Sequence, residues 1–175
     1  ELNEEKSTLT FTILRNPIDR LTSLYFYLKN FHIDRGVPKQ QNSLVVERNL
    51  SFEGLVSFLG EKLHDNFYTR FYSNKLHPKL LYDHDIKLIK DIDKYKVTES
   101  DYLRAIKNLE KIKVFILEKF DSKDLAKFLN TKIFIRSFHR NISIKDRQIS
   151  KDEINKVEAI NPFDIRLYDH FNLKK

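Results

Sequence analysis

The fold of this chain is decided by the stretch Phe11-Thr12-Ile13-Leu14-Arg15-Asn16-Pro17-Ile18-Asp19-Arg20-Leu21-Thr22-Ser23-Leu24-Tyr25. Residues 9–14 are apolar or β-branched at nearly every position, which predicts a strand buried on both faces. A helix is predicted directly after it, because Asn16 suits the N-cap and Pro17 the first helical position. A strand that ends in an arginine and turns into a helix can hold a phosphate, since free backbone N–H groups and Arg15 would point the same way.

The predicted helix has a buried face and a polar face. Its apolar residues recur at three-to-four spacing, at Leu21, Leu24, Tyr25, Leu28 and Phe31. Arg20, Ser23 and Tyr27 fall on a different face, which leaves Ser23 available to donate to a ligand. The alternative is that Arg15 forms a structural ion pair and Ser23 is a solvated helix residue.

Composition indicates one folded domain with a basic surplus. The 175 residues are 41% hydrophobic and include 14 Phe and 8 Tyr, which favours a packed core over a disordered chain. The 32 Lys and Arg exceed the 25 acidic residues by seven, and they are spread along the chain. This surplus suits an anionic ligand, while no motif that reads nucleic acid is present.

Residue types exclude several kinds of chemistry. The chain has no Cys, so it has no disulfide framework, thiolate nucleophile or cysteine-bound metal. Its six histidines show no metal-ligand spacing, and we predict no metal site. They are expected to be surface or hydrogen-bonded residues, and no catalytic residue is assigned.

The rest of the chain predicts alternating helices and strands in a single domain over residues 1–175. Four helices are expected to begin at the caps Ser51, Thr98 (with Asp101), Asp121 or Ser122, and Ser150. Two more helices are expected over part of 65–74 and from Pro162. Strands are expected over 113–118 and 133–138. This order predicts the α/β class, with a parallel sheet flanked by helices. Two well-marked strands are few for such a sheet, so further strands are expected before residue 1.

The motif R-[D/N]-P-x-x-R-x-x-S-x-Y, which spans Arg15 to Tyr25, resembles the 3′-phosphate-binding motif of sulfotransferases that use 3′-phosphoadenosine-5′-phosphosulfate (PAPS). Later segments resemble the carbohydrate type of that family, including heparan sulfate 2-O-sulfotransferases and bacterial relatives. They are Asp65-Asn66 with Thr69-Arg70, the run V-F-I-L-E-K-F-D over 114–121, His139-Arg140-Asn141-Ile142-Ser143, and D-I-R-L-Y-D-H-F over 164–171. Order and spacing agree from about residue 8 to residue 172.

The resemblance implies a P-loop-like sulfotransferase fold with PAPS as donor and 3′,5′-ADP as product. Arg15 and Ser23 would bind the 3′-phosphate. A loop with Arg140, Asn141 and Ser143 would cover the 3′-phosphate or the adenine, although a solvated basic loop is an equal alternative. Asn66 and Arg70 are candidates for contact with an acidic acceptor, with a structural ion pair as the alternative for Arg70.

Two departures from the family pattern matter. Asn16 stands where Asp is usual, and both residues cap helices well. Nothing matches the family's Lys-, Gly- and Ser/Thr-rich phosphosulfate loop, or the catalytic histidine that precedes the motif in the 2-O branch. The chain also begins at Glu1 and contains no Met, so it is expected to be the C-terminal portion of a sulfotransferase.

The predicted function is transfer of a sulfuryl group from PAPS to a hydroxyl, with a carbohydrate as the expected acceptor. The alternatives are a non-catalytic module that binds an anionic nucleotide or glycan, and a basic nucleic-acid-binding domain. The expected partners are the nucleotide donor and the acceptor, with no nucleic acid, and the oligomeric state is open. The sequence predicts no membrane span in this segment. It favours the cytoplasm for a bacterial source and the Golgi lumen for a eukaryotic one.

Overall fold

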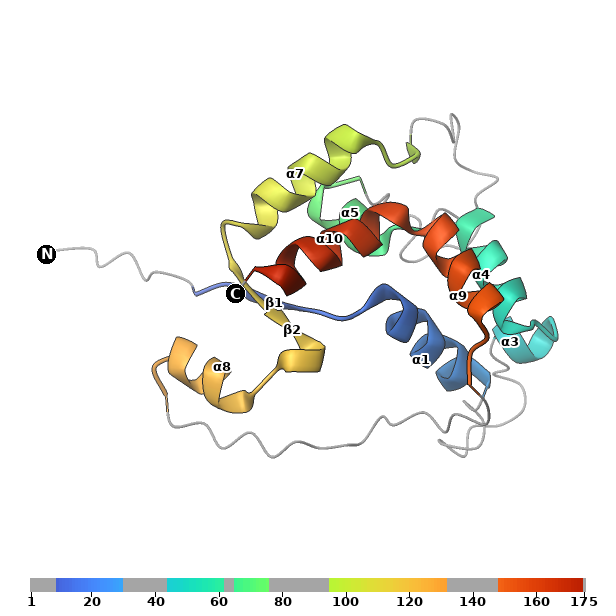
Figure 1. Cartoon of the computed structure of the whole chain (residues 1–175), viewed down its shortest axis with the longest axis horizontal. Coiled ribbons are helices and arrows are strands. Elements are labelled where there is room, and N and C mark those ends of the chain that lie inside the picture. Colours follow the sequence, from blue (N-terminus) through green and yellow to red (C-terminus); the bar gives the residue numbers. More distant parts are fainter. Residues whose placement is uncertain (1–8, 30–43, 62–64, 76–94, 132–147, 175) are drawn as a thin grey trace, which may run out of the picture.

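A computed structural model describes residues 9–29, 44–61, 65–75, 95–131 and 148–174 (Figure 1). Strands β1 (Phe11–Leu14) and β2 (Lys113–Ile116) pair in parallel, with Phe11 opposite Lys113 and Leu14 opposite Ile116. The helices are α1 (Pro17–Lys29), α3 (Leu44–Glu47), α4 (Phe52–Glu61), α5 (Phe67–Tyr72), α7 (Glu99–Leu109), α8 (Ser122–Phe128), α9 (Lys151–Ile160) and α10 (Pro162–Leu173). A 3-10 helix covers Leu117–Lys119. A small parallel sheet flanked by helices confirms the α/β class.

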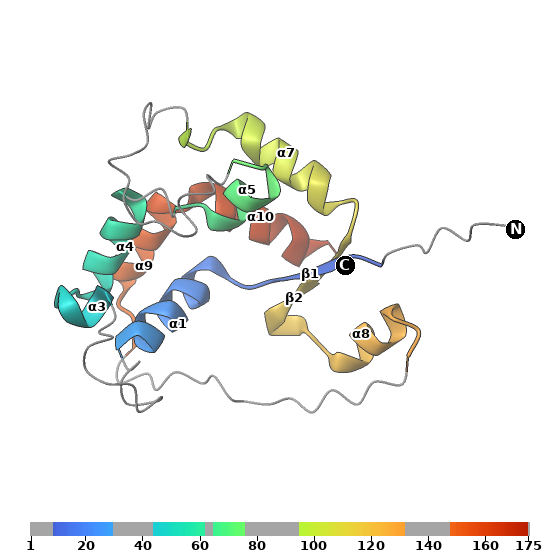
Figure 2. The same ribbon diagram turned by 180° about the vertical axis from the view of Figure 1, so that it is seen from behind.

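Helices cover the two faces of this sheet unequally. Figures 1 and 2 show α5, α7 and α10 on one side of the strands and α8 on the other. On the first side, Leu14 and Ile116 pack in one cluster with residues of α7 and α10, namely Tyr102, Ala105, Leu109, Leu167 and Tyr168. On the second side, the rings of Phe11, Phe115 and Phe128 meet edge to face.

The prediction that the first strand is buried on both faces is wrong. Leu14 is fully buried, whereas Phe11 and Ile13 are 38% and 37% exposed. The reason lies in the unequal cover: within the described residues, the short helix α8 contacts Phe11 through Phe128, while two longer helices cover the Leu14 side.

A second hydrophobic cluster joins α1 to α3, α4 and α9. Its buried members are Leu21, Tyr25, Phe26, Val45, Phe52, Leu55, Val56 and Val157. Leu24 and Leu28 of the predicted stripe are partly buried against it, and Phe31 lies outside the described residues. Gly60 allows α4 and α9 to approach closely, because a Cβ at this position would lie 3.2 Å from Cγ2 of Ile160.

Most of the predicted helix starts are confirmed. The Asn16 side chain accepts from the Ile18 N–H at 2.9 Å, and Asp121 accepts from the Lys123 N–H at 2.9 Å. Ser150 and Glu153 form a reciprocal capping box, and Pro162 opens α10. The strand predicted over 113–118 ends two residues early because the chain turns into the 3-10 helix, and α3 was not predicted. The predicted strand over 133–138 lies outside the described residues.

Candidate functional site

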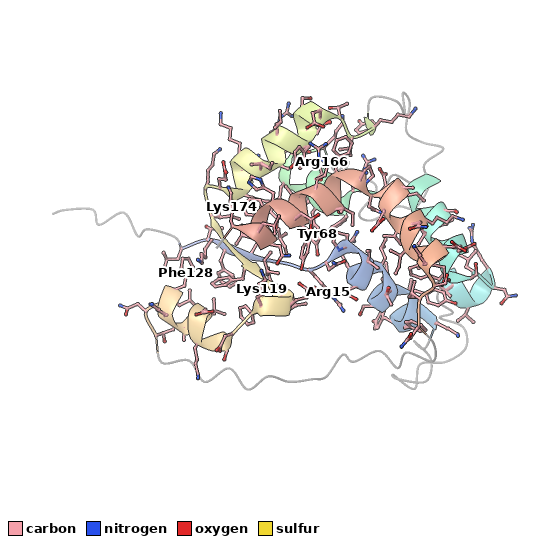
Figure 3. All side chains as sticks on the ribbon, in the orientation of Figure 1. Arg15, Tyr68, Lys119, Phe128, Arg166 and Lys174 are labelled. Carbon is pink, nitrogen blue, oxygen red and sulfur yellow. The ribbon has the colours of Figure 1, made fainter. Side chains whose placement is uncertain are left out.

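The candidate site lies where the two strands end. Leu14 and Ile116 are paired in the sheet, so the residues that follow them emerge at the same edge. Arg15 follows β1 and is half-buried, while Glu118 and Lys119 lie in the 3-10 helix after β2. In Figure 3, Arg15 and Tyr68 lie on opposite sides of the ribbon at the end of β1.

Three backbone donors of this junction, at Arg15, Asn16 and Ile18, are already bonded within the protein. The Arg15 N–H donates to the Tyr68 hydroxyl at 3.3 Å, and the Asn16 N–H donates to Oε1 of Glu118 at 2.9 Å. The Ile18 N–H is taken by the Asn16 side chain. The prediction that these N–H groups are free for a phosphate is therefore wrong, because α5 and the end of β2 bring acceptors to them. These three N–H groups are therefore not available to an anion, and Arg15 is the cationic side chain at this junction.

Glu118 links the junction to α10. Its second oxygen, Oε2, accepts from the Tyr168 hydroxyl at 3.1 Å. Burial and this hydrogen bond to Glu118 raise the pKa of Tyr168 to about 12, so the phenol stays protonated and can donate at neutral pH. The next residue, Lys119, donates from Nζ to the Asn172 carbonyl at 2.7 Å.

Sequence reasoning gave no role to Glu118 or Tyr168, although both stand in segments that carry the family resemblance. Glu118 is the glutamate of L-E-K-F-D over 117–121, and Tyr168 is the tyrosine of the D-x-x-L-Y pattern over 164–168. The motif matches therefore marked both residues as members of the family pattern. The contact between residues 50 positions apart could not be inferred from either motif alone.

Arg20 faces the interior between α1, α5 and α10. Its guanidinium lies over the rings of Phe67 and Tyr68, at 5.1 and 5.2 Å from their centroids. Nη2 is 3.9 Å from Oδ2 of Asp164, which is fully buried. Burial raises the pKa of Asp164, and the charge of Arg20 opposes this rise. Arg20 therefore packs against α5 and α10, a contact that its position on the polar face of the predicted helix does not reveal.

Asn66 belongs to a buried network between α5 and α10. Asn66 is only 3% exposed, and its side-chain Oδ1 accepts from the backbone N–H groups of Phe163 (2.9 Å) and Asp164 (3.2 Å). In return, Asp164 accepts from the N–H groups of Tyr68 (3.0 Å) and Thr69 (2.8 Å). Each helix thus has its N-terminal donors capped by a residue from the other.

Arg70 is also surrounded by protein acceptors. It is 1% exposed, and its Nη2 lies 2.6 Å from Oδ1 of Asp65. Nε donates to the Asp65 carbonyl at 2.8 Å, and Nη1 donates to the Tyr95 carbonyl. These contacts give Asn66 and Arg70 structural roles, and their contact with an acceptor stays a prediction.

The structure describes only two of the five residues predicted to bind the nucleotide, Arg15 and Ser23. Ser23 is half-buried on α1, two turns after Arg15, and it is not without a partner in the protein. Arg140, Asn141 and Ser143 lie outside the described residues. Their roles, and that of Ser23, stay predictions.

Two open pockets lie away from Arg15. One, of about 550 Å³, is lined by Lys113, Phe115, Asp124, Lys127 and Phe128, and the other, of about 540 Å³, lies between the end of α1 and the α3–α4 connection. No helix within the described residues has both the length and the apolar character needed to cross a bilayer.

Comparison with known proteins identifies one family. A model of the sulfotransferase family matches residues 2–172, a range that includes Arg15, Ser23, Glu118 and Tyr168. No curated protein and no solved structure gives a significant match. The match confirms the family resemblance at its coarser level, while the carbohydrate type and the heparan sulfate branch stay predictions.

Proposed function

We propose that this chain, which belongs to the sulfotransferase family, takes part in moving a sulfuryl group from PAPS to a hydroxyl, with a sugar as the acceptor. In this proposal, the segment supplies the anchor for the 3′-phosphate of the nucleotide. The observation that carries the proposal is the position of Arg15 at the carboxyl edge of the sheet, with its main chain held by Tyr68 and the adjacent peptide held by Glu118.

Arg15 is the side chain best suited to this role. A guanidinium offers a fork of donors that matches phosphate oxygens, and it stays charged at any working pH. Ser23 would add a hydroxyl donor from α1. The nucleotide would be covered by Arg140, Asn141 and Ser143. The position of α5 beside the site would be fixed by Asn66 and Arg70, and these two residues would contact the acceptor only if the acceptor approaches α5.

The reaction sets out what an anchor contributes. The sulfur–oxygen bond to the phosphate of PAPS breaks while a bond to the acceptor oxygen forms, and the acceptor proton passes to a base. The rate depends on in-line placement of donor and acceptor, on that base, and on positive charge at the leaving phosphate. Arg15 acts on placement, since it fixes one end of the nucleotide. No residue of the described part is assigned as the base.

Nucleotide binding tests this proposal. We expect the wild-type chain to bind 3′,5′-ADP more tightly than 5′-ADP, and Arg15→Ala to cost about 2–4 kcal/mol in 3′,5′-ADP binding through loss of a charge-assisted pair. Titration calorimetry at low and moderate salt measures both affinities. Arg104→Ala, which removes an exposed arginine of α7, is the matched control and should bind like wild type.

Other outcomes would point to other functions. Unchanged affinity in Arg15→Ala would remove this residue from the nucleotide site. A 3′-phosphate preference without any sulfuryl transfer in the presence of sugar acceptors would favour a non-catalytic binding module. Steeply salt-dependent binding of polynucleotides, without a 3′-phosphate preference, would favour a nucleic-acid-binding domain.

A further inference from the structure

Glu118 connects three elements that are far apart in the sequence. Its Oε1 accepts from the Asn16 N–H at 2.9 Å, and its Oε2 accepts from the Tyr168 hydroxyl at 3.1 Å. Asn16 lies between β1 and α1, Glu118 follows β2, and Tyr168 is in the middle of α10. The two oxygens of one carboxylate therefore join the candidate anion site to the end of β2 and to α10.

The Asn16 N–H belongs to the peptide that follows Arg15. The Arg15 N–H, on the other side of the same residue, donates to the Tyr68 hydroxyl at 3.3 Å. Both peptides that flank Arg15 are thus bonded to side chains from other elements, which limits rotation of its main chain. These bonds fix the point and direction in which the Arg15 side chain leaves the main chain, which narrows the region that its guanidinium can reach before a ligand arrives.

The chemistry of Glu118 suits this task. A carboxylate is a stronger acceptor than an amide or a hydroxyl, so it holds a backbone N–H firmly. A negative charge at the edge of an anion site would repel a phosphate, and only a gain in positioning makes such a residue useful there. Donation from the Asn16 N–H and the Tyr168 hydroxyl, one to each oxygen, disperses part of that charge.

We propose that Glu118 is a positioning residue, which holds the Arg15–Asn16 peptide through its carboxylate so that the Arg15 guanidinium is aimed at the nucleotide's 3′-phosphate. Tyr168 holds the carboxylate in turn. This inference rests on the proposed function, because it takes the 3′-phosphate as the ligand of Arg15.

The test compares affinities for 3′,5′-ADP and 5′-ADP, because their ratio isolates the contribution of the 3′-phosphate. Glu118→Ala removes both hydrogen bonds, and we expect it to reduce this ratio about 10-fold or more. Glu118→Gln keeps an acceptor for the Asn16 N–H and loses the charge, and Tyr168→Phe removes one support. Each of these two variants should reduce the ratio only about 3-fold. Affinity for 5′-ADP should not change in any of them.

Glu110→Ala is the matched control. Glu110 is an exposed carboxylate just beyond α7 that pairs with Lys174, away from the junction. Its loss should leave the ratio unchanged. If Glu118→Ala does not fold, the two milder variants carry the test, and wild-type ratios in both would overturn the proposal.

Combination with Arg15→Ala separates positioning from a general loss of structure. If Glu118 acts through Arg15, then Glu118→Ala in the Arg15→Ala background should cause no further loss in the ratio. Additive losses, or tighter binding of 3′,5′-ADP by Glu118→Ala, would overturn the inference while leaving the role of Arg15 intact. No 3′-phosphate preference in the wild-type chain would instead overturn the proposed function, and this inference with it.

Discussion

Arg20 and Asp164 place opposite charges in the interior beside the candidate site. Asp164 is fully buried and accepts from the backbone of Tyr68 and Thr69, while Arg20 lies 3.9 Å away with its guanidinium over the rings of Phe67 and Tyr68. Its Nε and Nη2 are buried without hydrogen-bond partners among the described residues. The guanidinium is therefore held by charge and by the aromatic rings, which packs α1 against α5 and α10.

Arg20→Met should destabilise the protein, and more at neutral than at acidic pH. Burial already raises the pKa of Asp164, and the charge of Arg20 opposes this rise. Loss of Arg20 would therefore raise the pKa of Asp164 further. A carboxyl whose pKa is raised in the folded state makes the folded protein less stable as pH rises. The loss begins near the pKa of the carboxyl in the unfolded chain, about 3.9, and is complete above its pKa in the folded state. We expect a cost of about 2–4 kcal/mol at pH 7 and a smaller cost at pH 4.5, where Asp164 is more readily protonated.

Urea unfolding of wild type and variant at the two pH values measures this difference. Arg104→Met, at an exposed position of α7, is the matched control and should change little at either pH. An equal deficit at both pH values would show that Arg20 stabilises the fold through packing alone.

The start of α7 is a cap that also joins two helices. Oδ2 of Asp101 accepts from the Thr98 N–H at 2.9 Å and from the Thr98 hydroxyl at 2.7 Å, and it pairs with Lys75, just beyond α5. Burial alone would raise the pKa of Asp101, but the hydrogen bonds from Lys75 and Thr98 outweigh it and lower the pKa below its usual value. The ionised carboxylate therefore stabilises the folded state.

Asp101→Asn should cost about 1–2 kcal/mol at pH 7, because the amide keeps an acceptor oxygen and loses the charge that Lys75 requires. A lowered folded-state pKa gives stability above the unfolded pKa, about 3.9, and this stability disappears as pH falls through the folded pKa. The difference from wild type should accordingly shrink below pH 4. Urea unfolding between pH 3 and pH 7 measures it, with Glu158→Gln, an exposed carboxylate of α9, as control. A deficit that stays constant over this range would contradict the assignment.

Helix starts of this kind were predictable because their determinants lie within four residues of one another. Asn16-Pro17, Thr98 with Asp101, and Ser150 with Glu153 each carry their capping partners locally. The strand cores over 11–14 and 113–116 were predictable for the same reason, from apolar runs. The exposure of Phe11 was not, because it depends on how much of a distant helix covers it.

The candidate site followed the same division. Arg15 was predicted from one contiguous motif, and its place at the sheet edge follows from strand order. The occupation of the junction's N–H groups by Tyr68 and Glu118 joins residues 53 and 102 positions apart, which no local pattern reveals. The buried partner of Arg20 was not predicted, because helical spacing separates a polar face from an apolar one, and it cannot tell when a charged residue finds a buried partner.

Across the whole molecule, the exchange of caps between α5 and α10 joins the middle of the chain to its end. Asn66 accepts from the N–H groups of Phe163 and Asp164, and Asp164 accepts from those of Tyr68 and Thr69, over separations of 95 to 98 residues. Figure 1 shows α5 and α10 lying together over the strands, between α7 and α1. Since Tyr68 and Tyr168 both support the Arg15 junction, this exchange also holds the candidate site together.

Loss of the exchange should therefore affect stability and the site together. Asn66 has a positive φ of 46°, a conformation that glycine adopts freely, so Asn66→Gly removes the side chain without backbone strain. It leaves two donors at the start of α10 without their acceptor, and we expect a loss of about 2–3 kcal/mol in unfolding free energy. The matched control is Asn74→Gly, which removes an exposed asparagine with a φ of 60° and should change stability by less than about 0.5 kcal/mol.

Urea unfolding of both variants, followed by the ratio of 3′,5′-ADP to 5′-ADP affinity in the folded proteins, separates two effects of Asn66. A stability loss with a reduced ratio would mean that the caps between α5 and α10 also set the geometry around Arg15. A stability loss with an unchanged ratio would confine Asn66 to the fold, since Glu118 and Tyr68 would then hold the junction without it. Equal stabilities of Asn66→Gly and Asn74→Gly would contradict the capping role, because they would show that the Phe163 and Asp164 donors are satisfied equally well by other acceptors.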